Sequence, residues 1–444
     1  MPPKDSNFKK FRAFLLNNIV TIVFLVVIVV GISASQNLSF SFFVNEVIAR
    51  FFRNGFLVLS LIIPVMAGLG LNFGIVVGAL AGILATLTVR YFEGGGVGGL
   101  LVCLALSLPL AILFGYLTGK LYNKTRGQEM IASLIVGYFA SGIYQFIVLF
   151  CVGAIIPVAA VHTMVKPDGI GFVATFDMGM HPNNAMFLPG EDKAGLMYVV
   201  DWMWRIPFGW ALIALGVGFL GYVLIKRLLA KRNPAIELLK PFALGMRIAL
   251  CAAVVFTGVY TLLYPESLLG GVRQIPAATG LVIIALALFN NYFNRTKLGQ
   301  DCRSVGQSQQ IARVSGINVD KTRIIATIIS TVLAAWGMII YMQNMGTVST
   351  YTAHMQIGMF SVASLLVGGA STTKAGVKNA LIGVILFNAM FIVSPAIGML
   401  VAPDNVNVGE FSRSFMVYGV IGVALGLYVW KAVKAARDKN RLVD

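Results

Sequence analysis

Charged residues are scarce in this chain, and acidic residues are the scarcest. Asp and Glu together number 17 of 444 residues against 34 Lys and Arg, and 11% of the sequence is charged. No carboxylate falls in the middle of a long apolar run. Proton-coupled transporters normally keep such residues at membrane depth despite a cost of about 2.5–3.5 kcal/mol each. The sequence therefore argues against proton-coupled exchange, whereas sodium bound by backbone carbonyls stays open.

Motifs for metal and nucleotide binding are also lacking. The four cysteines show neither the spacing of metal ligands nor that of a disulfide framework. The phosphate-binding pattern Gly-x-x-x-x-Gly-Lys-Ser/Thr is absent, because Gly119-Lys120 is followed by leucine. We expect no metal, no cofactor and no ATP site in this chain, so any ATP-driven work would belong to a partner.

Hydrophobic residues dominate what is present. They make up 58% of the sequence, and the mean hydropathy is +0.85, far outside the range of soluble globular proteins. We expect an all-α, polytopic integral membrane protein with about 10–12 transmembrane helices. Apolar runs that could span lie at 17–35, 56–71, 73–91, 98–118, 129–156, 206–225, 244–264, 277–293, 324–346, 357–371, 377–400 and 413–431.

The basic residues indicate the orientation of the chain. The net charge of +17 would suit nucleic acid, but the basic residues stand at the ends of apolar runs without interleaved aromatics, so we expect membrane lipid and no nucleic acid. With both termini in the cytoplasm, 26 of the 34 Lys and Arg lie on the inner side of a bacterial inner membrane. Residues 162–200 are then outside, and Cys302 should react with an impermeant thiol reagent only from inside. The first run resembles a signal peptide but is long enough to span, which favours its retention.

Three regions follow from these patterns. Residues 1–156 form an N-terminal transmembrane half, 157–276 an outer loop and an extra helix pair, and 277–444 a C-terminal half, with the two halves pseudo-inverted. Within 40–54, apolar residues recur at i, i+3, i+4 and i+7, which predicts a helix lying on the outer membrane surface.

Two apolar segments, 64–74 and 358–374, are interrupted by glycine or proline and are expected to be broken helices. Broken helices in corresponding positions of two halves are typical of a transport path near the midplane. A role in packing or interhelical hydrogen bonding would also suit each polar or aromatic residue near them. The candidate path residues are Asn72, Phe73, Gln343, Ser361, Ser364 and Asn388.

Four glycines, at positions 70, 74, 78 and 82, repeat every fourth residue and would share one face of a helix. Such a face lets a neighbouring backbone approach closely. We expect it to pack within the chain rather than to form a dimer seam.

The polar segment 294–323 lies between two apolar runs on the predicted inner face. Its small and apolar residues recur at helical intervals on either side of Gly306, and Gly316 closes the second piece. The pattern predicts two short amphipathic helices that face a cytoplasmic partner. The alternative is a solvated basic loop held by lipid headgroups.

This segment resembles the cytoplasmic coupling segment of ABC importer permeases for ribose-type sugars, nucleosides and branched-chain amino acids. Gln128-Glu-Met-Ile also resembles the start of that family's fifth span, and Val367-Gly-Gly-Ala-Ser371 its V-x-G-G-x-S motif. For residues 157–276 we can match no counterpart. The coupling pattern is met at Thr296, Gly299, Arg303, Gly306, Ala312, Gly316, Ile317 and Val319, whereas Ser304 and Ile311 stand where Ala is usual.

The resemblance implies a permease subunit, not an enzyme, that works as a dimer of identical or homologous chains. It further implies a cytoplasmic ATPase subunit that binds ATP and Mg, and an extracytoplasmic solute-binding protein. A path without charged side chains favours a neutral polar solute, a simple sugar or a nucleoside. The alternatives are a secondary transporter with broken helices and inverted repeats, which would not need ATP, and a scaffold without uptake. The expected ATPase contacts are Leu298, Gly299, Cys302, Arg303, Val305, Gly306, Ala312, Gly316 and Ile317.

Overall fold

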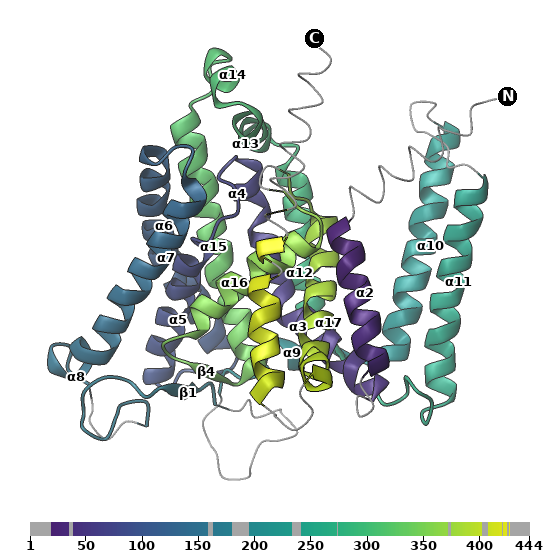
Figure 1. Cartoon of the computed structure of the whole chain (residues 1–444), viewed down its shortest axis with the longest axis horizontal. Coiled ribbons are helices and arrows are strands. Elements are labelled where there is room, and N and C mark those ends of the chain that lie inside the picture. Colours follow the sequence, from purple (N-terminus) through teal and green to yellow (C-terminus); the bar gives the residue numbers. More distant parts are fainter. Residues whose placement is uncertain are drawn as a thin grey trace.

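The computed structural model describes residues 19–34, 39–158, 163–179, 195–232, 241–272, 274–371, 374–401, 407–419, 421–423 and 426. The two chain ends, whose side of the membrane was predicted, and parts of the outer loop and the last span lie outside these residues. Helices dominate the described chain (Figure 1). Seven described helices are long and apolar enough to cross a membrane, and the bent pair Ala277–Phe293 and Lys297–Gln307 would raise the number to eight. The predicted all-α, polytopic membrane class is confirmed.

The N-terminal half is a series of helices that run alternately up and down the bundle (Figure 1). Its elements are α2 (Ile19–Ala34), α3 (Phe40–Ser60), α4 (Ile62–Met66), α5 (Ile75–Tyr91), α6 (Gly96–Lys124), α7 (Glu129–Phe146), the π-helical turn η1 (Ile147–Cys151) and α8 (Val152–Ala154).

Helix α3 differs from the expectation. It runs without a break past residue 54, so the predicted end of a separate surface helix there is wrong. No proline interrupts 50–60, and the single Gly55 costs only about 1 kcal/mol of helix propensity, too little to stop the hydrogen-bond series. Residues Phe40–Met66 together qualify as one span. The placement of its first turns at the membrane surface stays a prediction.

The middle region consists of short outer elements and a helical hairpin. Strand β1 (Thr175–Asp177) pairs antiparallel with β4 (Thr347–Ser349), and β2 (Arg205–Ile206) pairs with β3 (Ile275–Pro276). The remaining elements here are α9 (Val199–Met203), α10 (Phe208–Arg232) and α11 (Pro241–Leu263). Helices α10 and α11 pack on each other at the edge of the bundle (Figure 1).

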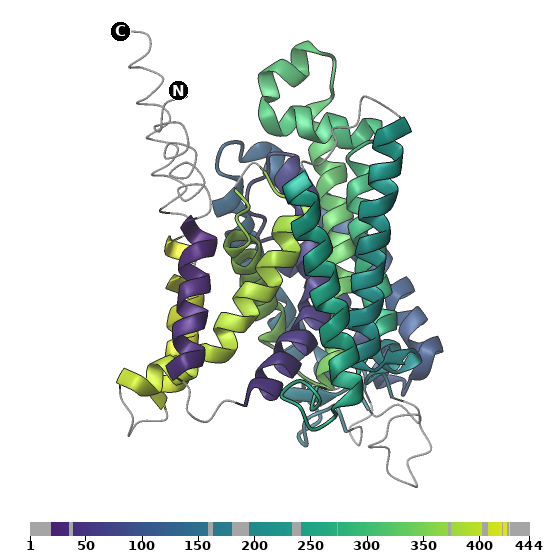
Figure 2. The same cartoon turned by 90° about the vertical axis from the view of Figure 1, so that its right-hand side faces the viewer.

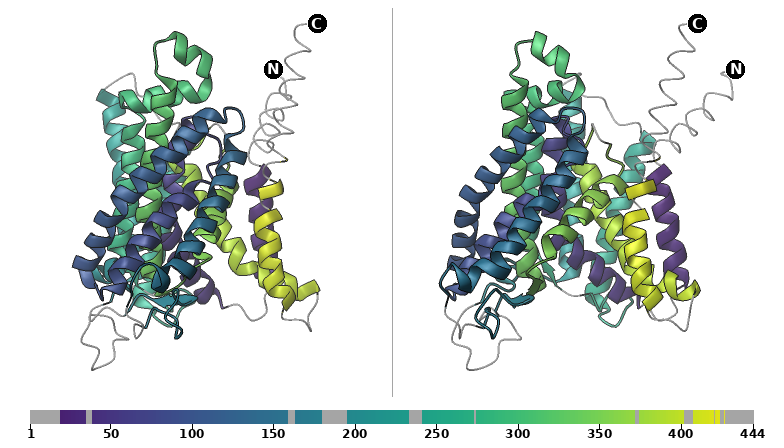
Figure 3. Two further views of the ribbon diagram at one scale, coloured as in Figure 1. Left: turned by 90° about the vertical axis from the view of Figure 1, so that its left-hand side faces the viewer. Right: turned by 60° about the vertical axis from the view of Figure 1, so that its left-hand side comes forward.

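The C-terminal half contains α12 (Ala277–Phe293), α13 (Lys297–Gln307), α14 (Gln309–Val314), α15 (Val319–Met345), α16 (Ala353–Val367) and α17 (Val377–Val401), followed by helical residues 407–419. This last described helix lies beside α2 (Figure 2), where Phe24 and Ile28 share an apolar cluster with Val417. Helices α13 and α14 lie at one end of the bundle, and β1, β4 and α9 lie at the other (Figure 3). The predicted inner and outer segments therefore occupy opposite ends.

Helix α15 is the centre of the bundle because glycines on its neighbours let it approach their backbones. A Cβ atom at Gly82 of α5 would lie 2.5 Å from the carbonyl oxygen of Ala335. Cβ atoms at Gly115 and Gly119 of α6 would lie 2.8 Å and 3.0 Å from Cα atoms of α15. Gly78 and Gly82, the two glycines of the series that lie in α5, pack against α15 within the chain, as expected. These contacts hold α5 and α6 on two sides of α15.

The first part of the glycine series was predicted wrongly. Helix α5 begins only at Ile75, so Gly70 and Gly74 precede it and do not extend its face. Gly70 has a φ of +69°, a left-handed conformation that a regular α-helix cannot contain. A Cβ atom at Gly70 would meet nothing within 4 Å.

Replacing Gly82 with leucine should force α5 away from α15, since the nearest atom is a backbone oxygen that cannot rotate away. Overpacking of this kind costs about 1–3 kcal/mol. We expect a clear drop in the melting temperature of the detergent-solubilised protein. Gly98→Leu is the matched control, because a Cβ atom there meets nothing within 4 Å; equal melting temperatures for the two variants would contradict the packing.

Candidate coupling segment and transport path

The polar segment folds as the two predicted short helices because each has its own N-cap. The side chain of Thr296 accepts from the amide of Gly299 at 3.2 Å, and that of Ser308 accepts from Ile311 at 3.3 Å. Such caps satisfy amides that the first helical turn leaves free. Gly316, with a φ of +78°, ends the second piece. Helices α13 and α14 are thus separate, well-bounded elements.

The residues predicted to contact an ATPase divide into two sets. Cys302, Val305 and Ala312 are buried, and Leu298 and Ile317 are half-buried against apolar neighbours. These side chains hold α13 and α14 to each other and to the bundle. The exposed set, free to meet a partner, consists of Arg303 and Gly316.

Gly306 seats the last turn of α13 on the backbone where α4 ends. A Cβ atom at Gly306 would lie 2.0 Å from the carbonyl oxygen of Met66, and one at Gly68 would lie 2.8 Å from the Cα of Gly306. No side chain fits between them. Gly299 is similarly confined, because a Cβ atom there would lie 1.9 Å from the carbonyl oxygen of Phe293. The coupling segment therefore touches the first broken segment directly.

The first broken segment has the expected interruption, between Ala67 and Gly74. Gly68 has a φ of +73°. Asn72 is 2% exposed, and its Oδ1 accepts from the amide of Gly74 at 2.9 Å and from the hydroxyl of Tyr122 at 2.8 Å. The freed backbone is thereby satisfied inside the protein, as it must be at membrane depth.

The second interruption is shorter than predicted. Helix α16 is regular up to Val367, so the break begins only after that residue, and Gly369 has a φ of +82°. Ser361 and Ser364 therefore lie in an intact helix. Ser364 is 1% exposed, and its hydroxyl donates to the carbonyl of Phe360 at 2.7 Å. Serine can bond back to the preceding turn in this way, so its presence did not require a break.

The six candidate path residues do not meet in one cavity. Gln343 is fully buried at the outer end, where its Oε1 accepts from the amide of Val200 at 3.3 Å. Asn388 accepts from Asn54 at 3.1 Å, between α17 and α3. Among the six, only Phe73 lines a cavity between α5, α7 and α16, of about 10 Å³; its other lining residues are Val76, Leu134, Gly137, Tyr138, Met355 and Met359.

Sequence reasoning missed a buried ion pair below the coupling segment. Arg323, whose side chain is fully buried, donates to Glu129 at 2.5 Å, which ties the start of α15 to the start of α7. Arg126 pairs with Asp320 beside it. Glu129 and Arg323 both stood at the inner ends of predicted spans, but the sequence did not show that these two spans are neighbours.

Two further features also escaped prediction. His354 is fully buried, and its Nε2 lies 2.8 Å from the hydroxyl oxygen of Ser141. A single histidine beside an apolar run was the sequence feature that could have indicated this contact. At the tip of the coupling segment, Ile311 is 69% and Val314 is 92% exposed. Both belong to the small and apolar residues that recur at helical intervals in this segment, and the spacing alone did not show that these two point away from the bundle.

The expected accessibility of Cys302 is contradicted by its burial. The thiol is 0% exposed, and desolvation raises its pKa to about 12, with the nearby Asp301 adding to the shift. Almost no thiolate is therefore present at neutral pH.

We expect an impermeant maleimide to label Cys302 only after unfolding, from either side of the membrane. Val314→Cys, which places a thiol on an exposed position of α14, should label rapidly in inside-out vesicles and not in intact cells. Mass spectrometry of the labelled peptides gives both results. Rapid labelling of Val314→Cys in intact cells would reverse the predicted orientation.

Comparisons with known proteins agree on one family. Residues 183–425, more than half of the chain, match the model of the branched-chain amino acid transport system / permease component family. The match includes the α10–α11 pair, for which the motif comparison found no counterpart. No solved structure matches.

Three curated relatives are permeases. A xylose transport system permease protein of Haemophilus influenzae is 32% identical over 152 residues, 34% of this chain and 37% of the relative. A nucleoside ABC transporter permease protein of Lactococcus lactis is 28% identical over 168 residues, 36% and 43% of the two chains. A probable branched-chain amino acid transport permease protein of Methanocaldococcus jannaschii is 25% identical over 245 residues, 49% and 72%.

The matched part of this chain spans less than half the length of the first two relatives. The family match and the helical membrane fold nevertheless agree with the resemblance carried by the 294–323 segment. This chain therefore belongs to the family of branched-chain amino acid transport system permease components.

Proposed function

We propose that this chain is the membrane-spanning permease subunit of an ATP-driven ABC importer in the bacterial inner membrane. Two such chains, identical or homologous, would form the path, an ATPase subunit would bind each at the α13–α14 end, and a solute-binding protein would deliver solute at the β1–β4 end. The contact between Gly306 and Met66 carries the proposal. It provides a direct mechanical connection between the segment that resembles a coupling segment and a broken helix.

The connection works because both sides of the contact are backbone. Helix α13 cannot shift toward α4 without moving residues 66–68, since neither Gly306 nor Gly68 has a side chain that could deform. Residues 67–74 are not helical, and they lead directly into α5, where the backbone carbonyl of Asn72 accepts from the amide of Ile75 at 3.4 Å. A displacement of α13 by an ATPase would thus be passed to the break. Alternating access needs such a bistable element.

The tip of the segment suits a protein partner. Ile311 and Val314 present an apolar patch on α14, whereas Arg303 of α13 lines a polar hollow of about 460 Å³ together with Arg295 and Gln300. An apolar anchor beside a polar rim is the usual composition of a protein interface. The exposed apolar side chains argue against a loop held only by lipid headgroups.

The cavity beside Phe73 is our candidate for part of the path. It lies between the first broken segment and α16, and its lining residues carry no charge. An aromatic face can stack on a sugar or a base, and freed backbone groups can hydrogen-bond a neutral solute. The relatives named for xylose and nucleosides support a neutral solute of this kind.

The coupling proposal predicts different defects for two variants of α13. Gly306→Leu should separate α13 from residue 66, so that the ATPase still binds but its activity is no longer stimulated by solute. Arg303→Glu should instead weaken ATPase binding, because its side chain is exposed. Co-purification and solute-stimulated ATP hydrolysis in proteoliposomes measure both. Coupled transport at the normal rate in both variants, or uptake without any ATPase, would contradict the proposal; the latter result would favour a secondary transporter.

The path proposal is tested at Gly137 rather than at Ser364, because Ser364 is 1% exposed and a bulky residue there would disrupt the packing of α16 itself. Gly137→Leu should fill the cavity and reduce uptake at least about tenfold, while Phe73→Ala should alter solute preference. Gly142→Leu, on the same helix with open space around it, is the control. Equal uptake by the two leucine variants would place the path elsewhere.

A further inference from the structure

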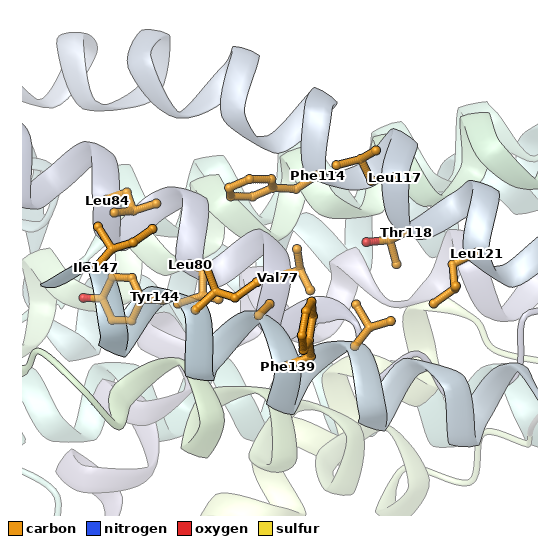
Figure 4. Close-up of a pocket in the computed structure, with 13 residues that line it drawn as sticks. Val77, Leu80, Leu84, Phe114, Leu117, Thr118, Leu121, Phe139, Tyr144 and Ile147 are labelled. Carbon is orange, nitrogen blue, oxygen red and sulfur yellow. The ribbon is translucent and has the colours of Figure 1, made fainter. Parts of the chain in front are cut away.

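A large apolar groove of about 350 Å³ lies between α6 and α7, with α5 as its floor (Figure 4). The walls are side chains that face the bilayer: Leu117 is 55% exposed and Phe139 is 69% exposed. Thr118 and Tyr144 supply the only side-chain oxygens among its lining residues, and the hydroxyl of Tyr144 already donates to the carbonyl of Thr350 at 2.9 Å. The groove can therefore offer little except van der Waals contact.

The groove follows the long axis of the bundle. Its wall on α7 and the start of η1 runs from Val136 to Ile147, about 16 Å at 1.5 Å per residue. On α6 the lining ends at Leu121, one turn before the helix ends at Lys124. The groove thus begins just below the α13 end of the bundle and reaches Tyr144, which bonds Thr350 near the outer end. An acyl chain that enters beside Lys124 can therefore lie along it past the middle of the membrane.

A basic side chain stands at the mouth of the groove. Lys124 is three residues beyond Leu121 and seven beyond Leu117, so it shares their face of α6. It is exposed and forms no ion pair within the described part of the chain. Lys120 lies nearby, with its ammonium 4.7 Å from the ring centroid of Tyr116. Lysines at this depth reach the level of phospholipid headgroups.

From this combination we infer a lipid site: the groove holds an acyl chain of an anionic phospholipid from the inner leaflet, with the phosphate at Lys124. An acyl chain in the groove supplies the van der Waals contacts that the apolar lining otherwise lacks. Because α7 also borders the Phe73 cavity through Gly137, the bound lipid sets the position of α7. The site does not depend on the proposed transport function.

The inference is tested by retained lipid. The full chain is reconstituted in nanodiscs of equal parts phosphatidylglycerol and phosphatidylcholine, and lipids that remain bound after extraction into detergent are counted by native mass spectrometry. Val136→Trp should fill the groove and abolish retention of both lipids. Lys124→Gln should reduce phosphatidylglycerol retention about fivefold, the loss expected for one basic residue, and leave phosphatidylcholine unchanged.

The controls place the same changes away from the groove. Ile112→Trp lies on another membrane-facing side of α6, where Ile112 is 42% exposed, and Lys226→Gln lies on α10; both should retain lipid as the wild type does. Ala140→Phe provides a second filling variant if Val136→Trp does not fold. Unchanged retention in a folded filling variant would overturn the inference. So would disulfide-linked dimers of Phe139→Cys in native membranes, which would mean that a second copy covers the groove.

Discussion

Backbone groups that leave a helix inside a membrane need partners within the protein, and this requirement governs the arrangement around residues 67–74. Lipid offers no hydrogen bonds, so an irregular backbone persists only where protein or water receives it. Here Asn72 and Ser133 supply the acceptors for the amides of Gly74 and Phe73. Tyr122 completes the set from α6. The break is therefore fixed in place by its own Asn72 and by two neighbouring helices, α6 and α7.

The same requirement explains why polar residues were weak guides to a path. Asn72, Ser364 and Asn388 are occupied by backbone or side-chain partners. Gln343 accepts from Val200 through Oε1, whereas its buried Nε2 has no partner among the described residues. Their polar groups stabilise helix ends and helix contacts. What faces the cavity between α5, α7 and α16 is aromatic and apolar, with Phe73 and two methionines among its lining residues. Solute recognition there would depend on shape and on aromatic contact more than on fixed charge.

Helix α15 connects the parts that matter for function. It follows directly after α13 and α14, and it is held between α5 and α6 by close backbone contacts. The buried pair of Arg323 and Glu129 fixes its first turns to α7. A buried pair of this kind contributes little net stability, but losing one partner leaves an unpaired charge at a cost of about 3–5 kcal/mol. The pair therefore restricts how α7 and α15 can move relative to each other.

The membrane class, the family resemblance, the two short helices at 297–314 and the break after Pro64 could be predicted from the amino-acid sequence, because they depend on local composition, capping and glycine. Which faces those elements bury depends on how the helices pack. Helical spacing could not tell that Ile311 and Val314 point outward while Cys302 points inward, since both sets recur at the same interval. The contact of Gly306 with Met66 and the pairing of Arg323 with Glu129 join residues about 200 positions apart or more. Only the packing of whole helices brings such residues together.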